Sequence, residues 1–180
     1  MTPRFSTVFV IGVAHCGSTL LGRMLDMHPR IHCVGEVLRI FAALEKRLPC
    51  GCGAAIPACP FWSMELPWLK RAVWPAGLRF RPAVFERLAR AAGKEITLDL
   101  SKSLAWRQVR FRRDAREGIV FLVRDSRGAL ASIARKGKPL EAQLARHVKW
   151  MQRYQAFVDR HAERSLVVRY EDLCRTPRAT

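Results

Sequence analysis

A chain of 180 residues, of which 49% are hydrophobic, can bury the core of one domain, and this excludes a globally disordered protein. Its formal net charge of +17 comes mostly from arginine and first suggests a nucleic-acid or anionic-membrane partner. The basic residues are spread along the chain without dense blocks. We therefore attribute the positive charge to an arginine-rich composition together with the binding of anionic ligands, and we expect no specific nucleic-acid partner. We expect one domain over residues 1–180.

The N-terminal segment shows no targeting signal. Its apolar run begins about seven residues into the chain and ends at Gly12, which is too short for a transmembrane span or a signal peptide. These features favour a cytoplasmic location without a membrane span.

The first predicted unit is a strand at residues 8–13 that leads through a glycine loop into a helix at 19–27. The loop at residues 12–19 has the spacing of a Walker A motif, G-x-x-x-x-G-K-[ST], but Ser18 stands at the lysine position. Such a loop can surround a phosphate with backbone N–H groups at a helix N-terminus. It lacks the lysine that reaches the β- and γ-phosphates. The loop therefore predicts a phosphate-like ligand other than ordinary ATP or GTP.

Residues 49–81 form a Gly/Pro/aromatic insertion, which we expect to be an irregular lid or substrate-side wall. It contains three clustered cysteines, Cys50, Cys52 and Cys59. This group is one ligand short of a zinc site and lacks the paired C-x-x-C spacing, although His32 or Cys33 could complete it. We favour structural thiols, leave zinc open, and expect no disulfide framework in a reducing compartment.

Three more apolar runs lie at residues 95–100, 119–123 and 166–169. Uninterrupted apolar runs are typical of parallel strands that are covered on both faces. Helical patterns occupy residues 82–92 and about 140–162. This alternation predicts an α/β doubly wound fold, a parallel sheet flanked by helices. Because the sequence stops just after a predicted strand-to-helix turn, we expect a C-terminally truncated domain.

The longest helical pattern, at about 140–162, is indicated by apolar residues near helical spacing. These are Leu144, Val148, Met151 and Phe157.

Polar residues suited to anions follow each predicted strand. They are His15 to Thr19 after the first, Ser101, Lys102 and Ser103 after the second, Arg124 to Arg127 and then Ser132 after the third, and Arg169 and Tyr170 after the last. In a doubly wound sheet, ligands bind outside the carboxyl ends of the strands. We therefore expect these groups to form one anion-binding site.

These motifs together resemble the sulfotransferase family that uses 3′-phosphoadenosine 5′-phosphosulfate (PAPS). The loop at residues 12–19 is similar to the family's lysine-free loop for the 5′-phosphosulfate. Arg124, with Ser132 eight residues later, is similar to the family's pair for the 3′-phosphate. Residues 168–173 resemble the strand whose tyrosine approaches the adenine.

Two further segments, residues 25–29 and Gly35-Glu36, are most similar to the carbohydrate and protein-tyrosine branches of the family and to their bacterial relatives. The resemblance implies a P-loop NTPase-like sulfotransferase fold over essentially the whole chain. Family members usually continue beyond the point that corresponds to residue 180, which again implies truncation.

The resemblance implies an enzyme that transfers a sulfonate group from PAPS to a hydroxyl or amine acceptor. The acceptor class is a small molecule, a carbohydrate or a peptide, and no metal is required. The implied nucleotide-binding residues are His15, Cys16, Gly17, Ser18, Thr19, Arg124, Ser132 and Tyr170. The resemblance implies Glu36 and His15 as catalytic candidates, and the place of Lys102 after a strand adds it as a third.

Each catalytic candidate also has a structural interpretation. His15 stands where the family commonly has lysine or arginine; a protonated imidazole can donate to the bridging oxygen, whereas a structural histidine would only cap backbone groups of the loop. Glu36 corresponds to the proposed general base of the protein-tyrosine branch, but it can also cap the helix predicted to begin there. Lys102 follows a strand, which favours a phosphate or sulfonate contact over a solvated side chain.

Two other functions remain open from the sequence. A variant P-loop kinase or nucleotidase would need a magnesium-binding carboxylate after a strand, for which Asp99 or Asp125 is a candidate. A non-catalytic module, either a truncated nucleotide binder or a polyanion binder, would explain the high positive charge without any reaction.

Overall fold

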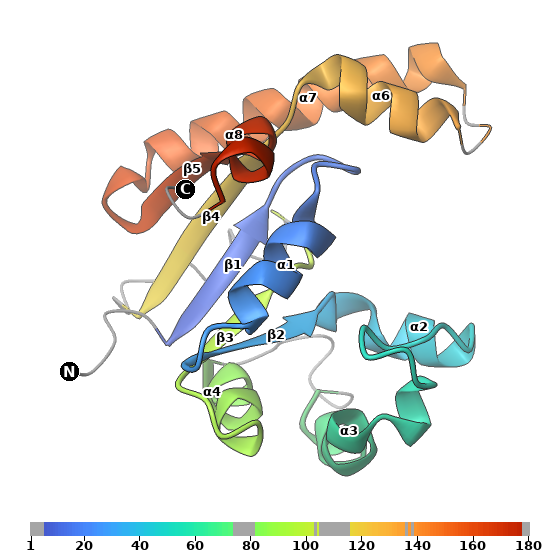
Figure 1. Ribbon diagram of the computed structural model, residues 1–180, viewed down its shortest axis with the longest axis vertical. Helices are drawn as coiled ribbons and strands as arrows, with labels where there is room; N and C mark the ends of the chain where they lie inside the picture. Colours follow the sequence, from blue (N-terminus) through green and yellow to red (C-terminus); the bar gives the residue numbers. More distant parts are fainter. Residues whose placement is uncertain are drawn as a thin grey trace.

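The computed structural model of the protein describes residues 6–73, 82–102, 104, 116–135, 137 and 139–177, and these contain one sheet of five parallel strands (Figure 1). The strands are β1 (Thr7–Ile11), β2 (Ile31–Gly35), β3 (Ile96–Asp99), β4 (Glu117–Val123) and β5 (Ser165–Arg169). Their spatial order is β2-β3-β1-β4-β5, and every neighbouring pair is parallel. β1 therefore lies in the middle of the sheet.

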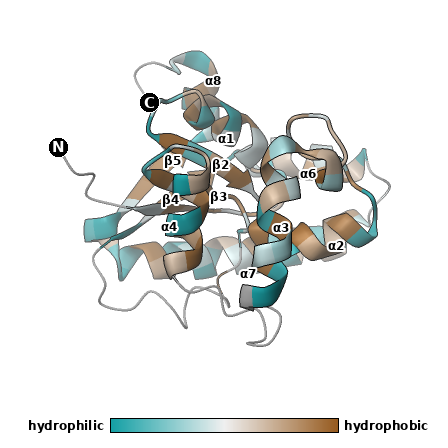
Figure 2. Cartoon of the chain, turned by 90° about the horizontal axis from the view of Figure 1, so that it is seen from below, coloured by the Kyte–Doolittle hydropathy of each residue, from teal (hydrophilic) through white to brown (hydrophobic). Residues whose placement is uncertain are grey.

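Helices cover both faces of this sheet. They are α1 (Ser18–Asp26), α2 (Ile40–Glu45), α3 (Pro60–Val73), α4 (Pro82–Ala91), α6 (Ser126–Ala134), α7 (Leu140–Asp159) and α8 (Tyr170–Arg175), with the 3-10 turns η1 (Val37–Arg39), η2 (Ile56–Ala58) and η4 (Ala162–Arg164). Figure 2 shows α1 and α8 on one side of the strands and α4 and α7 on the other. The result is a three-layer α/β arrangement.

Aromatic contacts attach the helices of one layer to the sheet. Phe9 of β1 meets Phe85 of α4 edge to face, with ring centroids 5.3 Å apart. Phe121 of β4 lies 5.9 Å from the ring of Tyr154 on α7. Phe9, Phe85, Phe121 and Tyr154 are all buried. Each such ring removes a large apolar area from water, so these pairs are a main source of stability for this layer.

The doubly wound α/β architecture expected from the sequence is confirmed as a parallel sheet flanked by helices. The four predicted strands are present, with ends that differ by no more than two residues from those expected. β2 is not predicted, because His32 and Cys33 interrupt its apolar run and β2 lies at an edge of the sheet. The prediction of an irregular segment is wrong for residues 60–73, which form α3.

α3 forms despite its composition because its apolar side chains are buried. Trp62, Leu66 and Leu69 pack in the same cluster as Val37 and Ile40. Burial outweighs the helix-breaking tendency of the internal proline, since most helical stability in proteins comes from packing. Residues 74–81 of the insertion lie outside the described residues.

The apolar residues that indicate the helix at about 140–162 do not all face the core. Phe157 is buried and Met151 is partly buried against the core, whereas Leu144 and Val148 are exposed. His147 and Tyr154 are buried instead. The polar tips of these two side chains have partners, because Ser126 Oγ lies 3.0 Å from His147 Nε2 and Tyr154 donates to a backbone carbonyl. Polar side chains that have hydrogen-bond partners can be buried at helix positions that an apolar pattern does not mark as buried.

The path of the chain creates a switch point at the centre of the sheet. From β1 the chain passes to the edge strand β2 and returns through β3; it then continues beyond β1 to β4 and β5. The connections that leave β1 and β4 therefore run in opposite directions and open a crevice between them, where doubly wound proteins bind ligands. Within the described residues, no helix has the length and apolar character needed to cross a membrane.

Candidate functional site

A cavity of about 820 Å³ lies at the carboxyl ends of the strands. Its described lining includes the loop after β1, Glu36 after β2, Ser101 and Lys102 after β3, Arg124 after β4, and one face of α7. The expectation that groups from different strand ends share one site is met for β1 to β4. Ser103 lies outside the described residues, and no described residue of 49–73 lines this cavity, so the lid role of the insertion stays a prediction.

The loop after β1 has the compact form that a phosphate site needs. A Cβ on Gly12 would lie 2.6 Å from the Leu122 carbonyl oxygen, so only glycine allows this close approach between β1 and β4. Gly17 is the N-cap of α1 in a left-handed conformation, with φ of 96°. A glycine N-cap leaves no side chain over the first turn of the helix. The N-terminus of α1, with its partial positive charge, therefore faces the cavity at Gly17, Ser18 and Thr19.

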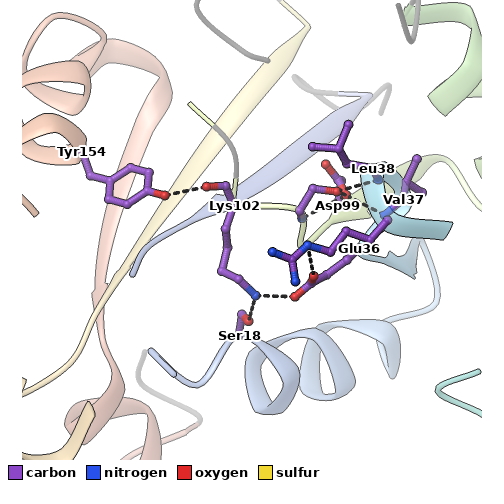
Figure 3. A network of polar contacts seen from close by, with 9 residues as sticks. Ser18, Glu36, Val37, Leu38, Asp99, Lys102 and Tyr154 are labelled. Atoms are coloured by element: carbon purple, nitrogen blue, oxygen red, sulfur yellow. Dashed lines mark hydrogen bonds and ion pairs between the residues drawn. The ribbon is translucent and has the colours of Figure 1, made fainter. Parts of the chain in front are cut away.

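Lys102 supplies the cation that the loop lacks. Its Nζ donates to Ser18 Oγ at 3.0 Å and to Glu36 Oε1 at 2.6 Å, as Figure 3 shows. The backbone of Lys102 is left-handed, with φ of 56°, and its carbonyl accepts a hydrogen bond of 2.5 Å from Tyr154 OH. A lysine from the end of β3 thus reaches the residue that occupies the Walker lysine position.

Glu36, which follows β2, accepts the second hydrogen bond of Lys102 Nζ. Its carboxylate also forms an ion pair of 3.4 Å with Arg39, and the side chain is 34% exposed. Glu36 is the N-cap residue of η1, but its side chain makes no capping hydrogen bond. The helix-cap alternative is therefore not supported, and the carboxylate is accessible to a substrate.

Asp99 holds the two loops that carry Glu36 and Lys102. Its buried Oδ1 accepts from the Ser101 backbone N–H at 3.1 Å and from Ser101 Oγ at 2.6 Å, and it accepts a longer bond of 3.4 Å from the Val37 N–H. Ser101 Oγ in turn accepts from the Leu38 N–H at 3.0 Å. Satisfied buried networks of this kind fix geometry.

The carboxylates that a magnesium-dependent enzyme would need are engaged elsewhere. Asp99 is part of the buried network just described, and Asp125 forms the N-cap of α6. The guanidinium of Arg127, which bonds the Asp125 carboxylate, lowers the pKa of Asp125 to about 2. Arg127 NH2 and Asp125 Oδ2 lie 2.6 Å apart in an ion pair. Neither aspartate is among the described residues that line the cavity.

Arg124 links β4 to the phosphate loop. Its NH1 donates to the His15 carbonyl at 3.0 Å, and its guanidinium carbon lies 4.2 Å from the ring centroid of Tyr170. The Arg124 side chain also lies close to Gly128, where a Cβ would be only 3.3 Å from Arg124 Nε. Glycine at this position therefore leaves room for the guanidinium group. The stacked arginine is thereby oriented before any ligand arrives, which lowers the entropic cost of a bidentate contact with an anion.

His15 and Ser132 are brought together by the fold. His15 Nδ1 lies 3.1 Å from Ser132 Oγ, and the His15 backbone is left-handed, with φ of 64°. A non-glycine residue in this conformation is strained, and such strain often marks a functional loop. The His15 ring thus contacts a residue of α6, and the backbone-capping alternative for His15 stays open.

Two predicted site residues lie behind the cavity. Cys16 is buried, and this burial raises the pKa of its thiol, so it is a packed neutral group. The ring of Tyr170 contacts Gly17 and lies against Arg124. Neither is among the described lining residues, and both support the loop from outside. Glu171 and Asp172 lie in the first turn of α8, and Glu171 accepts from the Asp125 N–H at 3.0 Å.

One face of α7 completes the cavity, and it is absent from the residues selected by sequence. It contributes Gln143, Arg146, His147, Trp150 and Tyr154. Their spacing of three and four residues is the signal that could identify them, since such residues share one face of a helix. Aromatic rings that line a cavity can stack against a nucleobase or another flat group.

The electrostatic balance of the cavity is strongly positive. Four cationic side chains, Arg39, Lys102, Arg124 and Arg146, line it in the described part of the chain. Glu36 is the one carboxylate residue among the described lining residues. With the N-terminus of α1 added, the arrangement attracts a ligand that carries more than one anionic group.

Comparison with models of known protein families finds no match, and comparison with curated proteins finds no significant match. The functional assignment therefore depends on the motifs and on the chemistry of the site.

Proposed function

We propose that this protein is a sulfotransferase that moves a sulfonate group from PAPS to a hydroxyl or amine acceptor. The observation that carries the proposal is the convergence of two anion sites in one cavity. One is the phosphate loop with Lys102, and the other is Arg124 with the His15–Ser132 pair. Two separated anion sites suit a nucleotide that is phosphorylated at both its 3′ and 5′ positions.

The residues present fit such a donor. The N-terminus of α1 and Lys102 would hold the 5′-phosphosulfate, and Arg124 with Ser132 would hold the 3′-phosphate. The resemblance of residues 12–19 and 123–132 to the PAPS-dependent family supports the same assignment. Trp150 and Tyr154 supply aromatic surface in the same cavity.

The chemistry of this donor is the transfer of a sulfonate group from the phosphate oxygen to the acceptor. Glu36 is the general base in our proposal, because its partly exposed carboxylate lies in the cavity, 2.6 Å from Lys102 Nζ. Lys102 and the loop N–H groups stabilise the negative charge that develops on the leaving phosphate. His15 donates a hydrogen bond when its imidazole is protonated.

The test is sulfonate transfer from radiolabelled PAPS to a panel of phenols, carbohydrates, amines and tyrosine peptides. We expect at least one labelled product with the wild-type chain and a rate lower by about 100-fold or more with Glu36→Gln, the usual contribution of a general base. Glu45→Gln, at the end of α2, is the matched control and should keep the wild-type rate.

The kinase or nucleotidase alternative has a distinct outcome. Magnesium-dependent turnover of ATP, together with no transfer from PAPS to any member of the panel, would overturn the proposal. The engaged positions of Asp99 and Asp125 favour the sulfotransferase reading.

A further inference from the structure

Outside the cavity, three thiols meet in the segment between α2 and α3. The Sγ atoms of Cys50, Cys52 and Cys59 all lie within 4.8 Å of one another, and all three cysteines are free. Within the described residues, no histidine, aspartate, glutamate or further cysteine joins this group. His32 and Cys33, which the sequence left open as additional ligands, are therefore not part of it.

A hydrogen-bonded turn at residues 50–54 contains the first two cysteines of the cluster, Cys50 and Cys52. The Cys50 N–H donates to the Ala54 carbonyl at 2.8 Å, and the Gly53 N–H donates to the Cys50 carbonyl at 2.9 Å. Gly53 has a φ of 90°, a left-handed conformation that favours glycine. This turn places Cys50 and Cys52 two residues apart around one tight bend of the backbone.

The third thiol comes from a separate short segment with its own support. The Cys59 N–H donates to the Ile56 carbonyl at 3.2 Å, and the Cys59 carbonyl accepts from the Ser63 N–H at 2.8 Å in the first turn of α3. Cys59 is buried, whereas Cys52 is exposed. Two independently hydrogen-bonded segments therefore hold three thiols in one cluster that opens to solvent on one side.

We propose that Cys50, Cys52 and Cys59 bind one zinc ion through three thiolates, with solvent in the fourth position. Thiolates select soft or borderline metals, so magnesium and calcium do not suit the site. Iron–sulfur clusters are generally held by four protein ligands, and the described group offers three. Zinc accepts three protein ligands plus water in a tetrahedral arrangement. A disulfide would use two thiols and leave the third without a role.

The zinc ion would fasten the insertion beside the candidate active site. α3 begins at the cluster, and its Trp62 and Leu66 pack with Val37, the residue that follows Glu36. α3 is also held to α4 without any metal, because Arg87 Nε donates to Glu65 Oε2 at 3.0 Å. Loss of zinc should therefore loosen the segment around residues 49–59 without unfolding the chain.

The experiment measures metal and thiols in the full chain, purified without chelators. We expect one zinc per chain by mass spectrometry of the metals, and six reactive thiols after denaturation in chelator, as the sequence contains six cysteines. Cys50→Ser and Cys52→Ser should each weaken zinc binding roughly 100-fold or more, because losing a ligand costs at least as much as losing its hydrogen-bond partner. The control Cys174→Ser changes an exposed cysteine of α8 and should retain the zinc.

Cobalt provides a second readout that does not depend on folding yield. Co²⁺ added to metal-free protein should give the thiolate-to-cobalt absorption of a tetrahedral site, and this signal should be lost in Cys59→Ala. Three results would each overturn the proposal: no zinc after reconstitution, copper in place of zinc, or two fewer reactive thiols than six because a disulfide has formed.

Discussion

Lys102 and Ser18 are 84 residues apart in the sequence, yet Lys102 Nζ donates to Ser18 Oγ at 3.0 Å. In a Walker A loop the lysine belongs to the loop itself. Here the cation comes from the end of β3, and its backbone is fixed by the hydrogen bond from Tyr154 OH. A single lysine thus contacts both the phosphate loop and the candidate base Glu36.

We predict that Lys102→Ala raises the dissociation constant of 3′,5′-diphosphoadenosine (PAP) by about 10- to 100-fold. Hydrogen bonds to charged groups contribute about 1.5–3 kcal/mol. Alanine retains the Cβ of lysine, so the left-handed backbone is under the same strain in the variant. Calorimetric titration checks the result, with the exposed Lys149→Ala of α7 as control. Equal affinities of the two variants would contradict a phosphate contact by Lys102.

The site residues at the strand ends could be predicted from the sequence, but their contacts and the face of α7 that completes the cavity could not. Glycine spacing indicates the phosphate loop, and the position of Arg124 after a strand indicates an anion contact. The reach of Lys102 to Ser18 depends on β1 and β3 being neighbours and on a φ of 56° that lysine rarely adopts. Neither condition can be deduced from a local pattern.

At the scale of elements, α6 and α7 meet through a buried histidine. His147 of α7 lies 3.0 Å from Ser126 Oγ at the start of α6, and burial lowers the pKa of His147 in the folded protein. Since α6 carries Ser132 and α7 carries Trp150 and Tyr154, this contact aligns two walls of the cavity. The helix α3, which was not predicted from the sequence, is also decided by such burial, because its apolar side chains pack against other elements.

We predict that stability depends on the protonation of His147. The unfolded chain protonates this histidine near pH 6.5, whereas the folded protein resists protonation to a lower pH. The stability that neutral His147 contributes is therefore fully present above about pH 6.5 and is lost as pH falls through its folded pKa. His147→Gln should cost about 1 kcal/mol at pH 7.5, the usual value of one hydrogen bond.

Urea denaturation of both proteins from pH 5 to pH 8 measures this effect. The difference in free energy of unfolding between wild type and His147→Gln should shrink as the pH falls below about 6.5. A difference that stays constant over this range would show that His147 is protonated equally in both states.

At the scale of the whole molecule, topology and charge act together. The order β2-β3-β1-β4-β5 places the ends of β1 and β4 at the switch point, and this general location could be predicted once a doubly wound sheet was recognised. The net charge of +17 attracts any nucleotide, so binding alone does not identify the ligand. A decisive comparison must hold the number of phosphate groups constant and screen distant charges with salt.

The central claim is that the cavity recognises a 3′-phosphate and a 5′-phosphate at the same time. The measurement is calorimetric titration at physiological salt with PAP and with ADP, which carries both of its phosphates at the 5′ position. We predict that PAP binds at least about tenfold more tightly than ADP, and that Arg124→Ala removes this preference. Arg127→Ala, which removes the same charge from an arginine whose side chain is 91% exposed, should preserve it. Equal binding of PAP and ADP by the wild-type chain would contradict the account.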